Sequence, residues 1–304
     1  MSLWIRGCVV SEPLAIAVEA LPTARHSWRS VIRRWNVMLP AVIILILVLI
    51  ALFPAPFAGI FGHGDPRACD VGRSLAPPSE GHPFGLDVQG CDVYANVIYG
   101  TQSSLSVGVL ATAVGLVIAL LLGTLGGLAG RAVDWTVSRV TDIFLGFPFL
   151  LGAIVVLTAV GERSVLTVSL VLALFGWPTM ARLMRSSVRS IRSADYVEAA
   201  VTMGIPRSRI IARYIIPNAI SPMLVIATLS VGGVIVAESS LTYLGIGLQA
   251  PAISWGLQLA SASSRFQLAP WLLVFPGLFL AITVLAITAL GDALRVAFDP
   301  RRQQ

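Results

Sequence analysis

The sequence predicts an all-α membrane protein with six transmembrane helices. Of its 304 residues, 56% are hydrophobic and only 12% are charged, which is far from the composition of a soluble domain. The apolar residues gather in long stretches that could each cross a bilayer, separated by segments rich in glycine, proline and charge. The net charge of +6 would suggest nucleic acid as a partner of a soluble protein. In a membrane protein it reflects arginines on the cytoplasmic side, so we expect a lipid bilayer and no nucleic acid.

The predicted spans are approximately 37–53, 104–130, 143–160, 165–181, 215–237 and 269–290. They divide the chain into a cytoplasmic tail with an interfacial helix (1–36), a first span with a long external loop (37–103), a core of five spans (104–291) and a C-terminal tail (292–304). With the N-terminus inside, 17 of the 21 arginines lie on the cytoplasmic side. This bias predicts that both termini are cytoplasmic. The start of the chain shows no pattern of a cleaved signal peptide.

The second span carries rows of small residues. Ala119, Gly123 and Gly127 are four residues apart, and Gly126 with Gly130 forms a second row. Small residues at this spacing let helices approach closely in membranes. We therefore expect this helix to be buried among the others.

The longest polar interruption in the second half of the chain is the segment 193–217, which predicts two short helices joined by a tight corner. Ser193 is the expected N-cap of the first helix. Gly204 is expected to end that helix in the left-handed region, and Pro206 to begin the second one. On the second helix, Arg209 lies on the polar side. From physical reasoning alone, a helix that rests on lipid headgroups is an equal alternative.

The residues of this segment resemble a known signature. Glu198-Ala199-Ala200, followed by Gly204 and by the pair Ile216-Pro217, is similar to the EAA motif of ABC importer permeases. In that family the segment is the coupling helix, which docks on a cytoplasmic ATPase. The resemblance implies a coupling site made of Glu198, Ala199, Ala200, Gly204, Pro206, Arg209, Ile216 and Pro217. Tyr214 stands where the family usually has isoleucine.

Three further stretches, 82–100, 237–256 and 291–301, resemble the C-type permease subunits of dipeptide, oligopeptide and nickel ABC importers. The resemblance implies a type I ABC importer permease fold in the cytoplasmic membrane of a bacterium. It also implies a B-type permease partner, two ATPase subunits and an external solute-binding protein. The expected cargo is a di- or oligopeptide, with nickel as the alternative. Cys91 stands where the family usually has arginine, so no role of that arginine carries over.

Cys69 and Cys91 both fall in the predicted external loop. Two cysteines in an oxidising compartment can pair as a disulfide, and the alternative is two free thiols. Asp142 and Glu238 lie near predicted membrane edges, where acidic residues can line a transport path. The simpler interpretation, which we favour, is that each is solvated or paired with arginine.

The sequence contains no lysine, and a phosphate-binding P-loop requires one. We therefore expect that this chain binds no cofactor of its own and is not an enzyme, and that ATP and Mg²⁺ bind to partner ATPase subunits. The three histidines show no metal-site spacing, so no metal site is predicted. An ion- or proton-coupled carrier and a membrane scaffold are the competing functions. A carrier of that kind would leave the segment 193–217 unexplained.

Overall fold

The computed structural model describes residues 35–62 and 64–298, and within these ranges every named element is helical. The predicted N-terminal tail, nearly all of its interfacial helix, and the last six residues lie outside the described residues. The helices are α2 (Trp35–Leu52), α3 (Pro54–Phe61), η1 (Val71–Arg73), α4 (Val93–Leu128), α5 (Arg131–Gly146), α6 (Phe149–Val160), α7 (Val165–Arg192), α8 (Asp195–Thr202), α9 (Arg207–Ile210), η2 (Ile211–Ile215), α10 (Ile216–Tyr243), α11 (Trp255–Ala262) and α12 (Trp271–Phe298).

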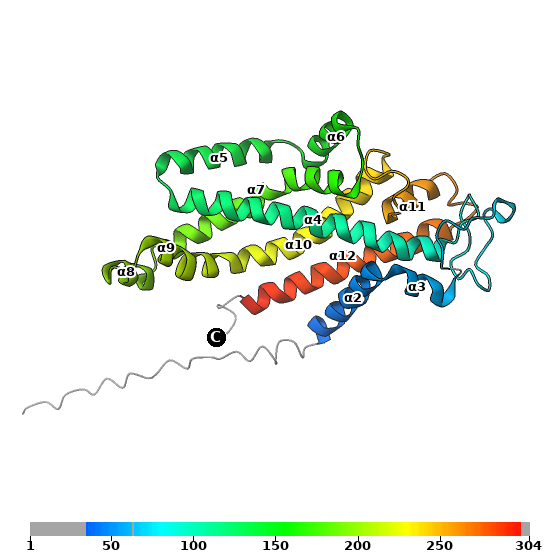
Figure 1. Ribbon diagram of the computed structural model, residues 1–304, viewed down its shortest axis with the longest axis horizontal. Helices are drawn as coiled ribbons and strands as arrows, with labels where there is room; N and C mark the ends of the chain where they lie inside the picture. Colours follow the sequence, from blue (N-terminus) through cyan, green and yellow to red (C-terminus); the bar gives the residue numbers. More distant parts are fainter. Residues whose placement is uncertain (1–34, 63, 299–304) are drawn as a thin grey trace, which may run out of the picture.

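Figure 1 shows these helices as an elongated bundle with two distinct ends. The short helices α8 and α9 lie at one end, which we call the α8 end. The loop between α3 and α4 and the short helix α11 lie at the other, which we call the α11 end.

Within residues 35–62 and 64–298, four helices are long and apolar enough to cross a membrane: α4, α7, the continuous helix of residues Arg207–Tyr243, and α12. Two further pairs, α2 with α3 and α5 with α6, meet the same criterion together but are bent by 99° and 87°. With each bent pair counted as one span, the described residues hold six candidate spans, which is the predicted number. The predicted bounds of the third span, 143–160, were wrong, because the helix breaks at Phe147 and Pro148 and the piece before the break begins at Arg131.

The helices also extend beyond the predicted apolar stretches. α4 begins at Val93 rather than at residue 104, and the Asp92 carboxylate caps it by accepting a hydrogen bond from the Tyr94 amide at 3.0 Å. α7 continues to Arg192 and α10 to Tyr243. Hydropathy finds only the apolar middle of a helix, whereas backbone hydrogen bonding continues into the polar surroundings.

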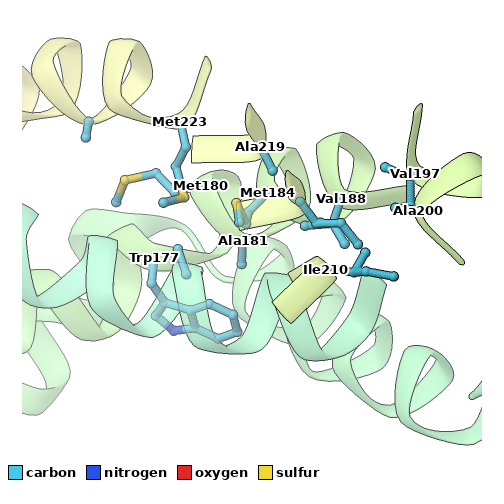
Figure 2. Packing of buried hydrophobic residues seen from close by; sticks show 13 residues of the cluster. Trp177, Met180, Ala181, Met184, Val188, Val197, Ala200, Ile210, Ala219 and Met223 are labelled. Carbon is cyan, nitrogen blue, oxygen red and sulfur yellow. The ribbon is translucent and has the colours of Figure 1, made fainter. Parts of the chain in front are cut away.

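The small residues of α4 pack against α7, as the sequence indicated. A Cβ atom on Gly123 would lie 2.6 Å from the Met184 Cβ atom, and one on Gly127 would lie 2.5 Å from Val188. Ala119 is fully buried beside them. Gly126 faces Val137 of α5 and the side chain of Arg185, whereas a Cβ atom on Gly130, which follows α4, would meet no atom within 4 Å. The second predicted row therefore does not act as a pair. Figure 2 shows the buried cluster that continues from this contact.

Ion pairs hold α5 on α7. The Asp134 carboxylate accepts from Arg185 Nε at 2.5 Å and also pairs with Arg189. Further along α5, Asp142 Oδ1 lies 2.8 Å from Arg182 Nη2. Its side chain is about half exposed, so the favoured interpretation of Asp142 as an arginine-paired surface residue is confirmed.

For Glu238 the same interpretation was wrong. Glu238 lies inside α10 and its exposed fraction is 0%. Its partners are hydroxyl groups. Thr242 Oγ1 donates to Oε1 at 2.8 Å and Ser239 Oγ donates to Oε2 at 3.2 Å. The hydroxyl groups of Ser104 on α4 and of Ser254, which precedes α11, lie beside the same carboxylate.

Backbone amides fix the direction of these hydrogen bonds. The amides of Leu248, Trp255 and Leu257 donate to the hydroxyl oxygens of Thr242, Ser104 and Ser254, at 3.0, 3.3 and 3.2 Å. Each of these hydroxyls is therefore left to donate its hydrogen towards Glu238. A carboxylate accepts up to about four such hydrogen bonds. We call the hydroxyl groups around this carboxylate, those of Ser104, Ser239, Thr242 and Ser254, the Glu238 cage. The cage ties the segment 244–257 to α4 and α10.

We predict that Glu238→Gln destabilises the fold, because the new amide group presents hydrogen-bond donors to hydroxyls that also donate. The expected loss is about 1–3 kcal/mol, seen as a lower midpoint of thermal unfolding in detergent. Glu162→Gln, at an exposed carboxylate, is the matched control. Equal midpoints for the two variants would show that the cage contributes no stability.

Candidate functional site

The segment 193–217 folds as two helical pieces around a corner, with one difference from the predicted capping. The N-cap of α8 is Ala194, not Ser193. Ser193 instead ends α7, and its hydroxyl donates to the Ser190 carbonyl at 3.1 Å. Asp195 lies in the first turn of α8, where a negative charge is favourable.

Gly204 forms the corner in the left-handed conformation that the sequence predicted, with φ of +72°. Its amide donates to the Val201 carbonyl at 3.0 Å, and the Ile205 amide donates to the Ala200 carbonyl at 3.2 Å. This pair of bonds is the Schellman arrangement that closes a helix at glycine. Pro206 follows as the N-cap of α9, so the chain leaves the corner directly into the next helix.

The second helix is continuous with the following span. α9 passes into η2, a π-helical turn over Ile211–Ile215, and then into α10. Pro217 explains the wider turn, because proline has no amide hydrogen and its ring excludes a normal bond to the carbonyl four residues earlier. The Asn218 side chain donates to the Tyr214 carbonyl at 2.6 Å. Ile216 and Pro217 therefore begin α10 and do not lie on α8.

α8 presents two different faces. Val197 and Ala200 are buried, at 3% and 1% exposure, in the cluster that also holds Ile210 (Figure 2). The opposite side is open to solvent. We call the exposed residues Tyr196, Glu198, Ala199 and Met203 the α8 patch.

The predicted site residues thus separate into four groups, of which Ile216 and Pro217 at the start of α10 form one. Glu198 and Ala199 are exposed in the α8 patch, and Gly204, Pro206 and Arg209 are exposed at the corner and on α9. Ala200 faces the protein interior. A larger residue at position 200 would therefore disrupt the core under α8.

At the α11 end, Cys69 and Cys91 are joined by a disulfide. The loop around it is built closely. A Cβ atom on Gly90, which has φ of +76°, would collide with the Asp70 carbonyl. The Asp87 carboxylate accepts hydrogen bonds from the amides of Gln89 and Cys91, both at 2.8 Å. Burial raises the pKa of Asp87 above its ordinary value, although these backbone bonds act in the opposite direction.

Comparison with known proteins assigns the family. The family described as "binding-protein-dependent transport system inner membrane component" matches residues 102–304. The chain belongs to this family. Its members are components of the inner membrane, in agreement with the long apolar helices of this chain. Among the described residues, no group of three or more histidine, cysteine, aspartate or glutamate side chains is arranged to hold a metal ion.

Relatives extend the match to nearly the whole chain. The chain is 34% identical over 290 residues to the dipeptide transport system permease protein DppC of Alkalihalophilus pseudofirmus, covering 95% of both chains. It is 37% identical to the oligopeptide transport system permease protein OppC of Escherichia coli K12, covering 96% of this chain and 97% of that protein. The fold matches a chain of the inward-facing MetNI methionine ABC transporter, with a TM-score of 0.56 and 21% identity, over 67% of this chain and 97% of that one. The fold is therefore that of a type I ABC importer permease, as predicted.

We predict that Gly204→Val destabilises the corner by roughly 1–2 kcal/mol, the cost of a left-handed conformation for a residue with a side chain. No atom lies within 4 Å of the position that a Cβ atom would take, so the cost is conformational and not steric. Gly204→Asn is the matched variant, because asparagine tolerates this region. Limited proteolysis of the 193–217 segment should be faster in the Gly204→Val variant than in the Gly204→Asn variant. Equal rates for the two would contradict the strained corner.

We predict that Cys69 and Cys91 are recovered as one cross-linked peptide pair in non-reducing peptide mapping of the membrane-isolated protein. Replacing both by serine should cost roughly 3 kcal/mol, because the disulfide closes a loop across a sequence separation of 22 residues. Cys8→Ser, at the third cysteine of the sequence, is the control and should leave the unfolding midpoint unchanged. Two freely alkylated thiols at positions 69 and 91 would refute the pairing.

Proposed function

We propose that this chain is the C-type permease subunit of an ATP-driven ABC importer that moves di- or oligopeptides into the cell. The family assignment and the peptide transport names of the relatives support this cargo. The observation that carries the mechanism is the α8 patch, an exposed surface on a short helix that is packed on the end of the bundle through its other face. A partner that binds the exposed face can displace this helix, and the packed face transmits the displacement to the core.

The proposal includes the other parts of the importer. A B-type permease would complete the transport pathway, two ATPase subunits would bind ATP and Mg²⁺, and an external solute-binding protein would deliver the peptide. Binding of ATP would close the ATPases and move α8, and this movement would turn the pathway outward. Hydrolysis would reset it.

The orientation follows from charge. The arginines of α7, at positions 182, 185, 189 and 192, and those at positions 207, 209 and 213 all lie towards the α8 end. Under the positive-inside rule, this end faces the cytoplasm and the disulfide loop faces outward. Both chain termini are then cytoplasmic. A protease-accessibility assay on sealed vesicles tests the assignment.

We predict that Tyr196→Asp with Met203→Asp abolishes peptide uptake while the chain still reaches the membrane. These side chains are 47% and 71% exposed, so charge at these positions should leave the fold intact but oppose docking of an apolar partner surface. Val71→Asp, at an equally exposed valine of the α11 end, is the matched control. Uptake and copurification of ATPase subunits are measured together. Normal uptake by the double variant would remove α8 as the coupling element.

We predict that the purified chain hydrolyses no ATP on its own, because it lacks the lysine that a P-loop requires. Reconstitution with both ATPase subunits should produce hydrolysis that the solute-binding protein stimulates. Hydrolysis that persists after every partner has been removed would contradict the assignment as a non-enzymatic subunit.

A further inference from the structure

A cavity of about 320 Å³ lies at the α8 end. Five elements contribute to its walls: α4, α7, α8, α9 and η2. The lining consists of two arginines and six aliphatic residues: Arg192, Arg207, Leu128, Val197, Val201, Ile210, Ile211 and Ile215. The coupling mechanism proposed above uses neither the cavity nor these arginines.

The cavity is at the membrane boundary. Leu128 is the last residue of α4, Arg192 is the last residue of α7, and Ile215 immediately precedes α10. The apolar stretches of α4 and α10 therefore end where the cavity begins, and α7 reaches the cavity through the arginine-rich turns that follow Ala181. A group bound there has hydrocarbon on one side and the charged end of the bundle on the other.

Charge distinguishes the two lining arginines from their neighbours. On α7, Arg182, Arg185 and Arg189 pair with the acidic residues of α5. For Arg192 and Arg207, no carboxylate within the described ranges lies within 4.0 Å. Neither Asp195 nor Glu198, the acidic residues of α8, lies within this distance of the two arginines. Two positive charges therefore adjoin an aliphatic cavity without an acidic partner from the described part of the chain.

We propose that this cavity binds an anionic phospholipid of the membrane, with its phosphate at Arg192 and Arg207 and part of an acyl chain against the aliphatic wall. Guanidinium groups bind phosphate oxygens through paired, charge-assisted hydrogen bonds. A free phosphate ion would satisfy the arginines but would gain nothing from six aliphatic side chains. An uncharged lipid would fill the wall but leave the charges unmatched. Only an anionic amphiphile is complementary to both parts of the lining.

The position of the cavity gives this lipid a role in the fold. Val197 and Val201 bring α8 into the wall, while Leu128 and Ile215 bring in the ends of the spans. A bound lipid therefore braces α8 against the core from the membrane side, and the α8 patch on the other face stays open. Anionic lipid should accordingly stabilise the segment 193–217 more than the rest of the bundle.

The experiment is native mass spectrometry of the full-length chain, with the partners that copurify, after exchange into detergent that contains equal amounts of phosphatidylglycerol and phosphatidylcholine. The wild-type chain should retain phosphatidylglycerol preferentially. A basic residue near a membrane contributes a factor of roughly five in affinity for anionic lipid, so Arg192→Gln with Arg207→Gln should weaken retention by roughly 25-fold. Arg295→Gln, at an exposed arginine of α12, is the matched control and should retain the lipid.

A second variant and a second ligand separate the sources of the phosphate. Leu128→Trp should reduce lipid retention by filling the cavity while keeping both arginines. If inorganic phosphate competes equally in the wild-type chain and in Leu128→Trp, the site binds free phosphate and the lipid proposal fails. If the double arginine variant keeps its lipid but loses the ATPase subunits, the arginines contact a protein and the proposal also fails. Neither result bears on peptide uptake, which the α8 patch variant tests separately.

Discussion

The close approach of α4 and α7 is the constraint on which the rest of the bundle depends. At Gly123 and Gly127 there is no room for a methyl group, because Met184 and Val188 occupy that space. Hydrocarbon solvates an apolar helix as well as another helix does, so association in a bilayer relies on close van der Waals contact. Glycine makes this contact possible. The remaining helices pack around α4 and α7, and the separation of these two helices is set at Gly123 and Gly127.

The same contact connects the interior to α8. The buried cluster begins near Trp177, passes through Met184 and Val188, and ends at Val197 and Ala200 (Figure 2). Close-packed interiors transmit displacement with little compression. A movement imposed on α8 therefore reaches α7, and it passes from α7 to α4 at the contact with Gly123 and Gly127. Under the proposed function this is a physical route from the ATPase to the spans. The Glu238 cage holds the opposite end in place through hydroxyl groups from α4, α10 and the segment before α11.

The sequence could predict features that depend on local chemistry. Gly204 had to be left-handed because it ends one helix immediately before another, and the glycine row of α4 implied a close neighbour. It could not predict features that depend on distant segments. The burial of Glu238 depends on Ser104 and Ser254, which are far from it in the chain. The start of α5 at Arg131 was not predicted, because its acidic residues find their arginine partners on the distant helix α7 only in the fold.

The position of Ala200 changes what the EAA-like signature means physically. Glu198 and Ala199 are exposed, whereas Ala200 is buried against the cluster that includes Val188 and Ile210. A small residue at 200 lets α8 lie close to the core. Under the proposed function, the signature would combine two requirements on one helical turn. The exposed residues would face the ATPase and Ala200 would seat the helix, so a substitution at either position would stop coupling for a different reason.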